Sequence, residues 1–304
     1  MQIVILLATH NSARFLRDQL DSLLSQTVRD FRIVAHDDAS RDDTCAILDE
    51  YAAHDTRLTV LPAGCPCGSA QANFWFLLQN APEADYYLFC DHDDVWFSQK
   101  IEKTLSAMRA AEDGDLPVLV HSDLSVTDEN LSVLAPSLWR LQKLTPNPTF
   151  ANNLVQNHVT GCSVMINRPL YLLAQKTPSA EGMIMHDWYL TLLALAFGRV
   201  TTVNEPLIFY RQHGNNEVGA KNVGNFSYLA RRAARWKKNR ALFAAAFMQA
   251  ALLTRIYGTT GPLAPAADFA QNANRSKLAR LRCYARTHAW KNTFLRRLGQ
   301  LLFG

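Results

Sequence analysis

The alternation of short apolar runs with helical patterns over the first 125 residues constrains the fold most. Apolar runs predict strands at residues 3–7, 31–35, 58–61, 86–90 and 118–122. Between them, apolar residues at helical spacing predict helices over residues 15–24, 44–53, 70–79 and 99–111. Strand–helix alternation at this spacing predicts an α/β fold, with a doubly wound, mainly parallel sheet that carries helices on both faces.

Polar residues follow the predicted strands and indicate where a ligand binds. "ATHN" follows the first strand, "HDDAS" the second and "DHDD" the fourth, while Asp123 follows the fifth. In open parallel sheets, ligands bind beyond the carboxyl ends of the strands. We therefore expect these polar residues to gather at one edge of the sheet.

The stretch "YLFCDHDDVW" at residues 87–96 places three carboxylates within four residues. It is either a solvated acidic turn or a metal site, because like charges this close destabilise one another without a cation. In an extended segment, residues i and i+2 point the same way, so we expect Asp91 and Asp93 to converge. Paired carboxylates suit Mg²⁺ or Mn²⁺, which also bind phosphate oxygens. No GxxxxGK[ST] or GxGxxG motif is present, so the metal would hold a diphosphate.

Three ordered motifs, "ATHN", "DDASRDDT" at residues 37–44 and "DHDD" at 91–94, resemble the inverting, GT-A fold glycosyltransferases of family 2. The resemblance covers residues 1–216. "CDHDDVW", "VTGCSVMINR", "HDWYL" and "YRQHGNN" are similar, more narrowly, to bacterial rhamnosyltransferases, which build O-antigen or other surface polysaccharides from dTDP-L-rhamnose. The resemblance implies sugar transfer from a nucleoside-diphosphate donor to a growing cell-surface polysaccharide or lipid-linked glycan. A UDP-sugar is the next candidate donor.

Residues that match the family motifs imply a nucleotide-sugar site. Thr9 and Asn11 would lie near the nucleotide. Asp38, or its neighbour Asp37, would hydrogen-bond the base, and Asp91 would contact the ribose.

The resemblance also implies a metal ligand and a catalytic base. Asp93 would bind the Mg²⁺ or Mn²⁺ that bridges the diphosphate, and Asp187 in "MHDWYL" matches the base. Many members have Glu-Asp here, whereas His186 replaces the Glu in this chain. Inverting transfer needs a base that removes the acceptor hydroxyl proton, and a helix N-terminus favours an ionised carboxylate. The structural alternative is that Asp187 only caps the helix.

Four more residues are candidates on chemical grounds. Arg211 or His213 could offset charge on the departing diphosphate, and His213 could instead ligate the metal. The alternative is a surface turn whose arginine caps a strand. Trp96 and Trp188 flank the acidic motifs and could form a platform for the sugar or acceptor, or could belong to the core.

Charge divides the chain in two. Residues 1–220 contain 15 Lys and Arg against 26 Asp and Glu, whereas residues 221–304 contain 16 Lys and Arg against Asp268 alone. We predict a catalytic domain over 1–220 and a basic amphipathic helical region over 221–304, with a break at 258–265 between two helices. Basic amphipathic helices lie on anionic membranes, which predicts a position on the inner face of the cell membrane. The alternative is that the helices pack on the catalytic domain. We expect no nucleic-acid partner, because no such motif accompanies the charge.

Other classes of protein fit the sequence less well. No apolar run is long enough for a transmembrane helix, and the isolated cysteines are typical of a cytoplasmic protein. A processive synthase should show Q-x-x-R-W, but Arg232 stands where "AARW" would need Gln. A sugar nucleotidyltransferase should show a Gly-rich first loop, and "LLATHNS" has no Gly. An inactive membrane-associated scaffold of the same fold is the remaining alternative, and the intact acidic motifs argue against it.

Overall fold

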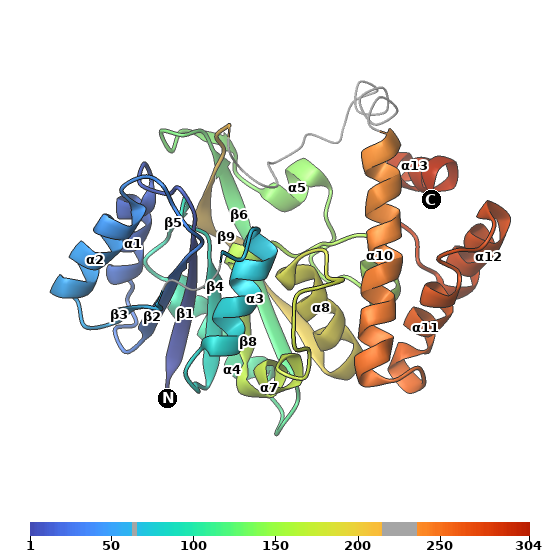
Figure 1. Ribbon diagram of the computed structural model, residues 1–304, viewed down its shortest axis with the longest axis horizontal. Helices are drawn as coiled ribbons and strands as arrows, with labels where there is room; N and C mark the ends of the chain where they lie inside the picture. Colours follow the sequence, from blue (N-terminus) through green and yellow to red (C-terminus); the bar gives the residue numbers. More distant parts are fainter. Residues whose placement is uncertain (63–65, 215–235) are drawn as a thin grey trace.

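The computed structural model describes residues 1–62, 66–214 and 236–304 and contains a nine-stranded sheet (Figure 1). The strand order is β3-β2-β1-β4-β8-β6-β9-β5, and β7 pairs with β6. The strands are β1 (Ile3–Thr9), β2 (Arg32–Asp37), β3 (Leu58–Val60), β4 (Tyr86–Cys90), β5 (Val95–Trp96), β6 (Val118–Thr127), β7 (Val133–Ala135), β8 (Met165–Asn167) and β9 (Arg199–Arg211).

Strand direction confirms a largely parallel sheet. β3, β2, β1 and β4 run parallel, and β6 runs parallel to β9. β8 is antiparallel to both β4 and β6, and β5 is antiparallel to β9. The register pairs Leu7 with Cys90 and Thr9 with Asp37, so the segments after β1, β2 and β4 leave the sheet at one edge. We call this the carboxyl edge.

Helices cover both faces of the sheet, as predicted. One core cluster holds Ile3, Ile5 and Leu7 of β1, and the other holds Val4 and Leu6, because alternate strand residues point to opposite faces. The helices of this region are α1 (Leu16–Leu24), α2 (Thr44–His54), α3 (Ala70–Asn80), α4 (Lys100–Ala111), α5 (Leu138–Gln142), α6 (Phe150–Asn153), α7 (Arg168–Ala174) and α8 (His186–Phe197).

The C-terminal region packs on the sheet domain through α10 (Trp236–Tyr257), α11 (Ala264–Gln271), α12 (Lys277–Thr287) and α13 (Phe294–Phe303). Phe247 of α10 and Phe269 of α11 share a core cluster with Leu192 of α8. The described residues therefore support the packing alternative for part of this region. The predicted boundary at 220 and the basic stretch at 227–235 lie outside the described residues, so the two-domain division stays a prediction.

Two sequence expectations about element length were wrong. The second basic helix is divided into α12 and α13, because His288 takes a left-handed conformation (φ 56°) after α12. β6 continues to Thr127 through its pairing with β9, which places Asp123 inside the strand. The Asp123 carboxylate accepts hydrogen bonds from the Ser137 hydroxyl and the Trp139 N–H, so it anchors α5.

Within residues 1–62, 66–214 and 236–304, none of the helices combines the length and the apolar character that crossing a bilayer requires.

Candidate active site

Asp37 organises the loop that follows β2. Its carboxylate accepts hydrogen bonds from the Thr9 hydroxyl at 2.9 Å and from the Ser40 N–H and hydroxyl at 2.8 and 2.6 Å. Thr9 is 1 % exposed, so its side chain orients Asp37 within the protein. These contacts place both residues at the carboxyl edge, and their role toward a nucleotide stays a prediction.

Asp38 joins two loops at the same edge. Its Oδ2 accepts the Gly68 N–H at 2.9 Å, and its own N–H donates to the Thr9 carbonyl at 2.9 Å. Asn11 is exposed with φ 49°, and its Oδ1 accepts the Arg41 N–H at 2.8 Å. A nucleotide base that hydrogen-bonds Asp38 would therefore contact a carboxylate whose orientation is already fixed by the backbone amide of Gly68.

The "DHDD" tetrapeptide separates its carboxylates into two groups. Ligand atoms of Asp91, Asp94 and Cys162 lie within 4.8 Å of one another, whereas Asp93 bonds His213. The expected convergence of Asp91 and Asp93 stays a prediction. Because β4 ends at residue 90 and the chain bends before β5, the alternation rule for extended segments does not support it.

Asp93 and His213 form a buried, directly hydrogen-bonded pair. Asp93 Oδ2 lies 2.7 Å from His213 Nε2, and their side chains are 10 % and 9 % exposed. A carboxylate suits Mg²⁺ or Mn²⁺, and a cation bound by Asp93 would replace the hydrogen bond from His213. Burial opposes ionisation of Asp93, but the hydrogen bond from His213 and the nearby His92 bring its pKa below the usual value. The carboxylate is thus available as an anion.

Asp94 lies beneath this pair and is fully buried. Burial, followed by the charges of Asp93 and Asp91, raises its pKa well above the usual value. Its Oδ1 accepts the Arg211 N–H at 3.1 Å. Asp94 thus lies between the acidic group and Arg211, whose backbone it holds.

Arg211 is a structural residue of the site. Its Nε donates to the Asp93 carbonyl at 2.9 Å, its Nη1 to the Glu129 carbonyl at 2.7 Å, and its Nη2 to Asp18 Oδ2 at 2.8 Å. The guanidinium also lies 4.4 Å from the centre of the Phe15 ring and is 3 % exposed. These contacts hold the backbone of Asp93, so the expectation that Arg211 faces the diphosphate is not supported.

Trp96 and Trp188 belong to the core, which corrects the platform interpretation. They are 2 % and 5 % exposed, so neither ring presents a face to a sugar. The Trp188 indole N–H donates to the Asn153 carbonyl. The Trp96 ring lies 3.5 Å from the Nζ of the fully buried Lys100, whose pKa burial lowers to about 8.

Asp187 has the environment of a general base. It lies in the first turn of α8 after the cap residue Met185, and it is 6 % exposed, so the capping alternative does not account for it. Its carboxylate accepts the backbone N–H of Trp188 and hydrogen bonds from Gly161 and the Asn157 side chain. Burial nevertheless raises its pKa to about 7. A base that titrates near neutral pH can both accept and release a proton.

A short turn lies between Asp187 and the acidic group of Asp91, Asp94 and Cys162. In η1 (Gly161–Ser163), the Gly161 N–H bonds Asp187, and the next residue, Cys162, places its thiol beside Asp91 and Asp94. Sequence reasoning assigned no role to this turn. The glycine within "VTGC" was the available signal.

His186 explains why residue 161 is a glycine. The buried His186 ring lies 4.1 Å from the Phe74 ring and 4.9 Å from the Phe89 ring between their centres. A Cβ at Gly161 would lie 2.7 Å from His186 Nε2 and 3.7 Å from the Asp187 Cβ. Burial lowers the pKa of His186 to about 3, so a neutral ring supports the turn.

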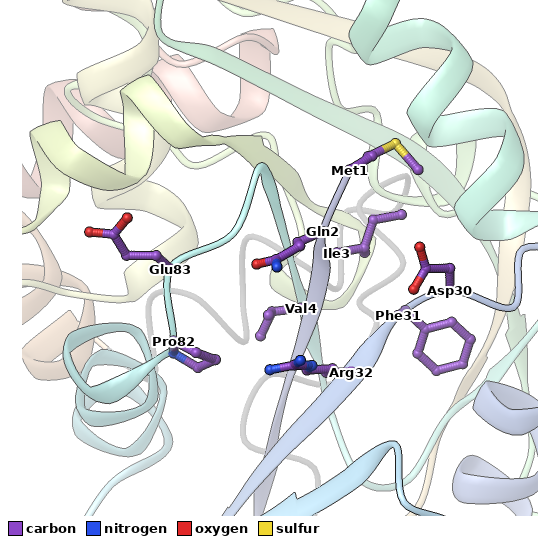
Figure 2. Close-up of a pocket in the computed structure, with 9 residues that line it drawn as sticks. All are labelled: Met1, Gln2, Ile3, Val4, Asp30, Phe31, Arg32, Pro82 and Glu83. Carbon is purple, nitrogen blue, oxygen red and sulfur yellow. The ribbon is translucent and has the colours of Figure 1, made fainter.

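A separate cavity of about 270 Å³ lies at the opposite edge of the sheet (Figure 2). It is lined by the first residues of β1 and β2 and by Pro82 and Glu83. We do not place the nucleotide there, because ligands of such sheets bind beyond the carboxyl ends of the strands.

The sequence of this chain is similar to those of bacterial glycosyltransferases. Over 235 residues, the chain is 26% identical to the dTDP-rhamnosyl transferase RfbG of Shigella flexneri, covering 74% of this chain and 76% of the relative. It is 25% identical to the putative teichuronic acid biosynthesis glycosyltransferase TuaG of Bacillus subtilis, covering 70% and 80%.

Solved structures show the same fold. Residues 1–349 of S. aureus TarS align with a TM-score of 0.57 at 16% identity, covering 99% of this chain and 90% of that one. The mannosyltransferase PcManGT from Pyrobaculum calidifontis, in complex with GDP-Man and Mn²⁺, aligns with a TM-score of 0.52 at 17% identity, covering 97% and 77%. The family model of "Glycosyl transferase family 2" matches residues 4–172. Because this match covers more than half of the chain, the protein belongs to glycosyl transferase family 2.

Proposed function

We propose that this family 2 glycosyltransferase is an inverting, metal-dependent enzyme that transfers L-rhamnose from dTDP-L-rhamnose. The acceptor is a growing cell-surface polysaccharide or lipid-linked glycan. The 26% identical relative named as a dTDP-rhamnosyl transferase supports the donor, and a UDP-sugar is the second candidate.

The observation that carries the proposal is the environment of Asp187. Burial raises its pKa to about 7, and two backbone N–H groups and the Asn157 side chain orient its carboxylate. In the proposed reaction, this carboxylate takes the proton of an acceptor hydroxyl. The acceptor oxygen then bonds the anomeric carbon of the donor as the bond from that carbon to the diphosphate oxygen breaks, and the nucleoside diphosphate leaves.

The donor half of the site is proposed around Asp93 and His213. The Asp93 carboxylate suits Mg²⁺ or Mn²⁺, which when bound would offset the charge of the departing diphosphate, and His213 lies beside that carboxylate. Asp91 would contact the ribose, and Asp38 or Asp37 the base. Thr9 and Asn11 would act by shaping the loops that hold these acids.

The acceptor and the cellular position are proposed from the chain as a whole. A relative named for teichuronic acid biosynthesis supports a cell-surface glycan as the class of acceptor. The basic residues of 221–304 support a peripheral position on the inner face of the membrane, beside a catalytic domain over 1–220. We propose no nucleic-acid partner.

Release of nucleoside diphosphate by the purified chain tests the proposal. The donors are dTDP-L-rhamnose, UDP-sugars and GDP-sugars, each with Mg²⁺, Mn²⁺ or EDTA and with a glycan acceptor. We expect metal-dependent release of dTDP, which Asp93→Asn abolishes. Release from a different donor would overturn the rhamnosyl assignment. Metal-dependent nucleotide binding without release from any donor would favour the inactive scaffold.

A further inference from the structure

The helix α13 buries polar residues and exposes apolar ones, which is the reverse of the usual arrangement of a surface helix. Its polar residues Arg296 and Gln300 are 7 % and 0 % exposed and face the protein. Phe294, Leu301 and Leu302 are 78 %, 41 % and 54 % exposed and face outward. A surface helix normally buries its apolar residues, so the exposed face of α13 requires its own explanation.

Specific hydrogen bonds fix this orientation. Arg296 Nη2 donates to the carbonyl of Gln142, the last residue of α5, at 2.7 Å. Gln300 Nε2 donates to the Ala289 carbonyl at 2.8 Å, and Gln300 Oε1 accepts the Lys291 N–H at 3.0 Å. Rotating α13 to bury its leucines would leave these buried polar groups without partners, which costs about 1–3 kcal/mol for each. The outward position of the apolar residues is therefore built into the fold.

The start of α12 lies near the end of α13 and carries a further exposed leucine. Lys277 Nζ donates to the Leu302 carbonyl at 3.1 Å, which brings the start of α12 to the end of α13. The neighbouring Leu278 is 58 % exposed. We call Leu278, Phe294, Leu301 and Leu302 the α13 patch.

Lys and Arg residues lie close to the α13 patch in the sequence, whereas Asp and Glu residues are almost absent there. Arg275, Lys277 and Arg297 are exposed on α13 or at the start of α12. Among residues 236–304 the sequence has a single acid, Asp268, and this acid is paired with Arg286. The combination of apolar and cationic groups without free carboxylates matches the chemistry of an anionic membrane surface, where aromatic and leucine side chains enter the interface and cations meet phosphate groups.

We propose that the α13 patch docks onto an anionic phospholipid bilayer. A second copy of the chain is the weaker candidate, because a two-fold contact would bring the same cations against each other. In Figure 1, α13 and the carboxyl edge both lie in the upper part of the view. The purpose of such docking rests on the proposed function, since a lipid-linked acceptor presents its glycan at a bilayer surface.

Vesicle co-sedimentation of the full chain tests the docking. The vesicles are phosphatidylcholine with or without phosphatidylglycerol. The test variant is Phe294→Gln/Leu301→Gln/Leu302→Gln, and the matched control is Leu134→Gln/Leu172→Gln, whose leucines are 64 % and 48 % exposed on the sheet domain. We expect a loss of about tenfold or more in the partition coefficient of the test variant on anionic vesicles, and none for the control. Arg275→Gln/Lys277→Gln should weaken binding only to the anionic vesicles, and added salt should reduce that difference.

The outcomes separate docking from catalysis. Nucleoside-diphosphate release with a water-soluble acceptor should be the same for wild type and test variant. Release by a wild-type chain that ignores anionic vesicles would overturn docking and leave the proposed function standing. Vesicle binding without release from any donor would support docking and overturn the proposed function.

If light scattering shows that the test variant only converts a dimer to a monomer, with vesicle binding unchanged, the patch is a protein interface. Thermal melts check folding, and Phe294→Gln alone replaces the triple variant if that unfolds.

Discussion

The carboxyl edge and the α13 patch place polar and apolar groups in opposite ways. At the edge, Asp93, Asp94 and Asp187 are 7 %, 0 % and 6 % exposed. On α13, the aromatic and leucine side chains are exposed and an arginine is buried. Each arrangement violates the usual distribution of residues between core and surface.

We propose that both departures from that distribution serve function. Buried acids acquire pKa values and cation affinity that solvated acids lack. Exposed apolar residues keep affinity for another apolar phase. We therefore expect substitutions at the carboxyl edge to change the rate of sugar transfer. Substitutions on the buried face of α13 should change stability, and those on its exposed face should change membrane attachment.

The largest effect is expected for Asp187→Asn. The substitution removes the proton acceptor and leaves Asp93 and His213 in place, so kcat should fall by about 10³-fold while donor and Mn²⁺ affinities stay unchanged. Steady-state kinetics and calorimetry measure the two quantities. Asp268→Asn is the control from the C-terminal helices and should change kcat less than twofold. An Asp187→Asn enzyme with a tenth of wild-type activity would disprove the role of base.

Gly161→Ala should lower kcat by about 10- to 100-fold with a smaller change in the donor KM. The new Cβ would lie 2.7 Å from His186 Nε2, which forces the turn away from Asp187. Gly114→Ala is the control, because its φ of 55° strains the backbone with no atom within 4 Å of the new Cβ. That variant should lose stability and keep its kcat. Equal kcat values for wild type and Gly161→Ala would show that the turn does not position the base.

The pH dependence should report the buried base. Because Asp187 accepts a proton only when ionised, kcat/KM should rise about tenfold per pH unit below about 7 and then level off. Its folded pKa lies above the usual 3.8, so the unfolded chain ionises first. Asp187 therefore lowers stability as pH rises from 3.8 to about 7. Melting temperatures across this range should fall less steeply for Asp187→Asn than for wild type.

The smallest catalytic effect is expected on α13. Arg296→Met leaves the Gln142 carbonyl at the end of α5 without its donor and should lower the free energy of unfolding by about 2 kcal/mol. Phe294→Gln on the outer face should change it by less than about 0.5 kcal/mol. Urea titrations measure both, and neither variant should alter kcat with a soluble acceptor. A larger loss for Phe294→Gln would mean that the outer face is packed in the folded chain.

The first strands and the acidic motifs could be predicted because their signals are local. Apolar runs define β1, β2 and β4, and parallel pairing brings whatever follows them to one edge. The resemblance of "MHDWYL" to the family motif pointed to Asp187, and its role as base stays a proposal. What the sequence could not give was direction: the bend after β4 sends Asp91 toward Cys162 and Asp93 toward His213.

Roles that depend on long-range packing were missed for the same reason. Arg211 and Asp93 are 118 positions apart, and no local pattern tells whether a guanidinium meets a backbone carbonyl or a phosphate. The tryptophans beside the acidic motifs are indistinguishable from a ligand platform until their burial is known.

The sequence by itself determined the order of the first strands and helices, the acids that follow them and the separation of charge along the chain. These follow from periodicity and composition, which are properties of short segments. Only the tertiary structure decided that burial raises the pKa of Asp187 to about 7, that His213 meets Asp93, and that α13 turns its leucines outward. Burial and hydrogen bonding depend on which distant segments surround a side chain, and the chain fixes those neighbours only when it folds.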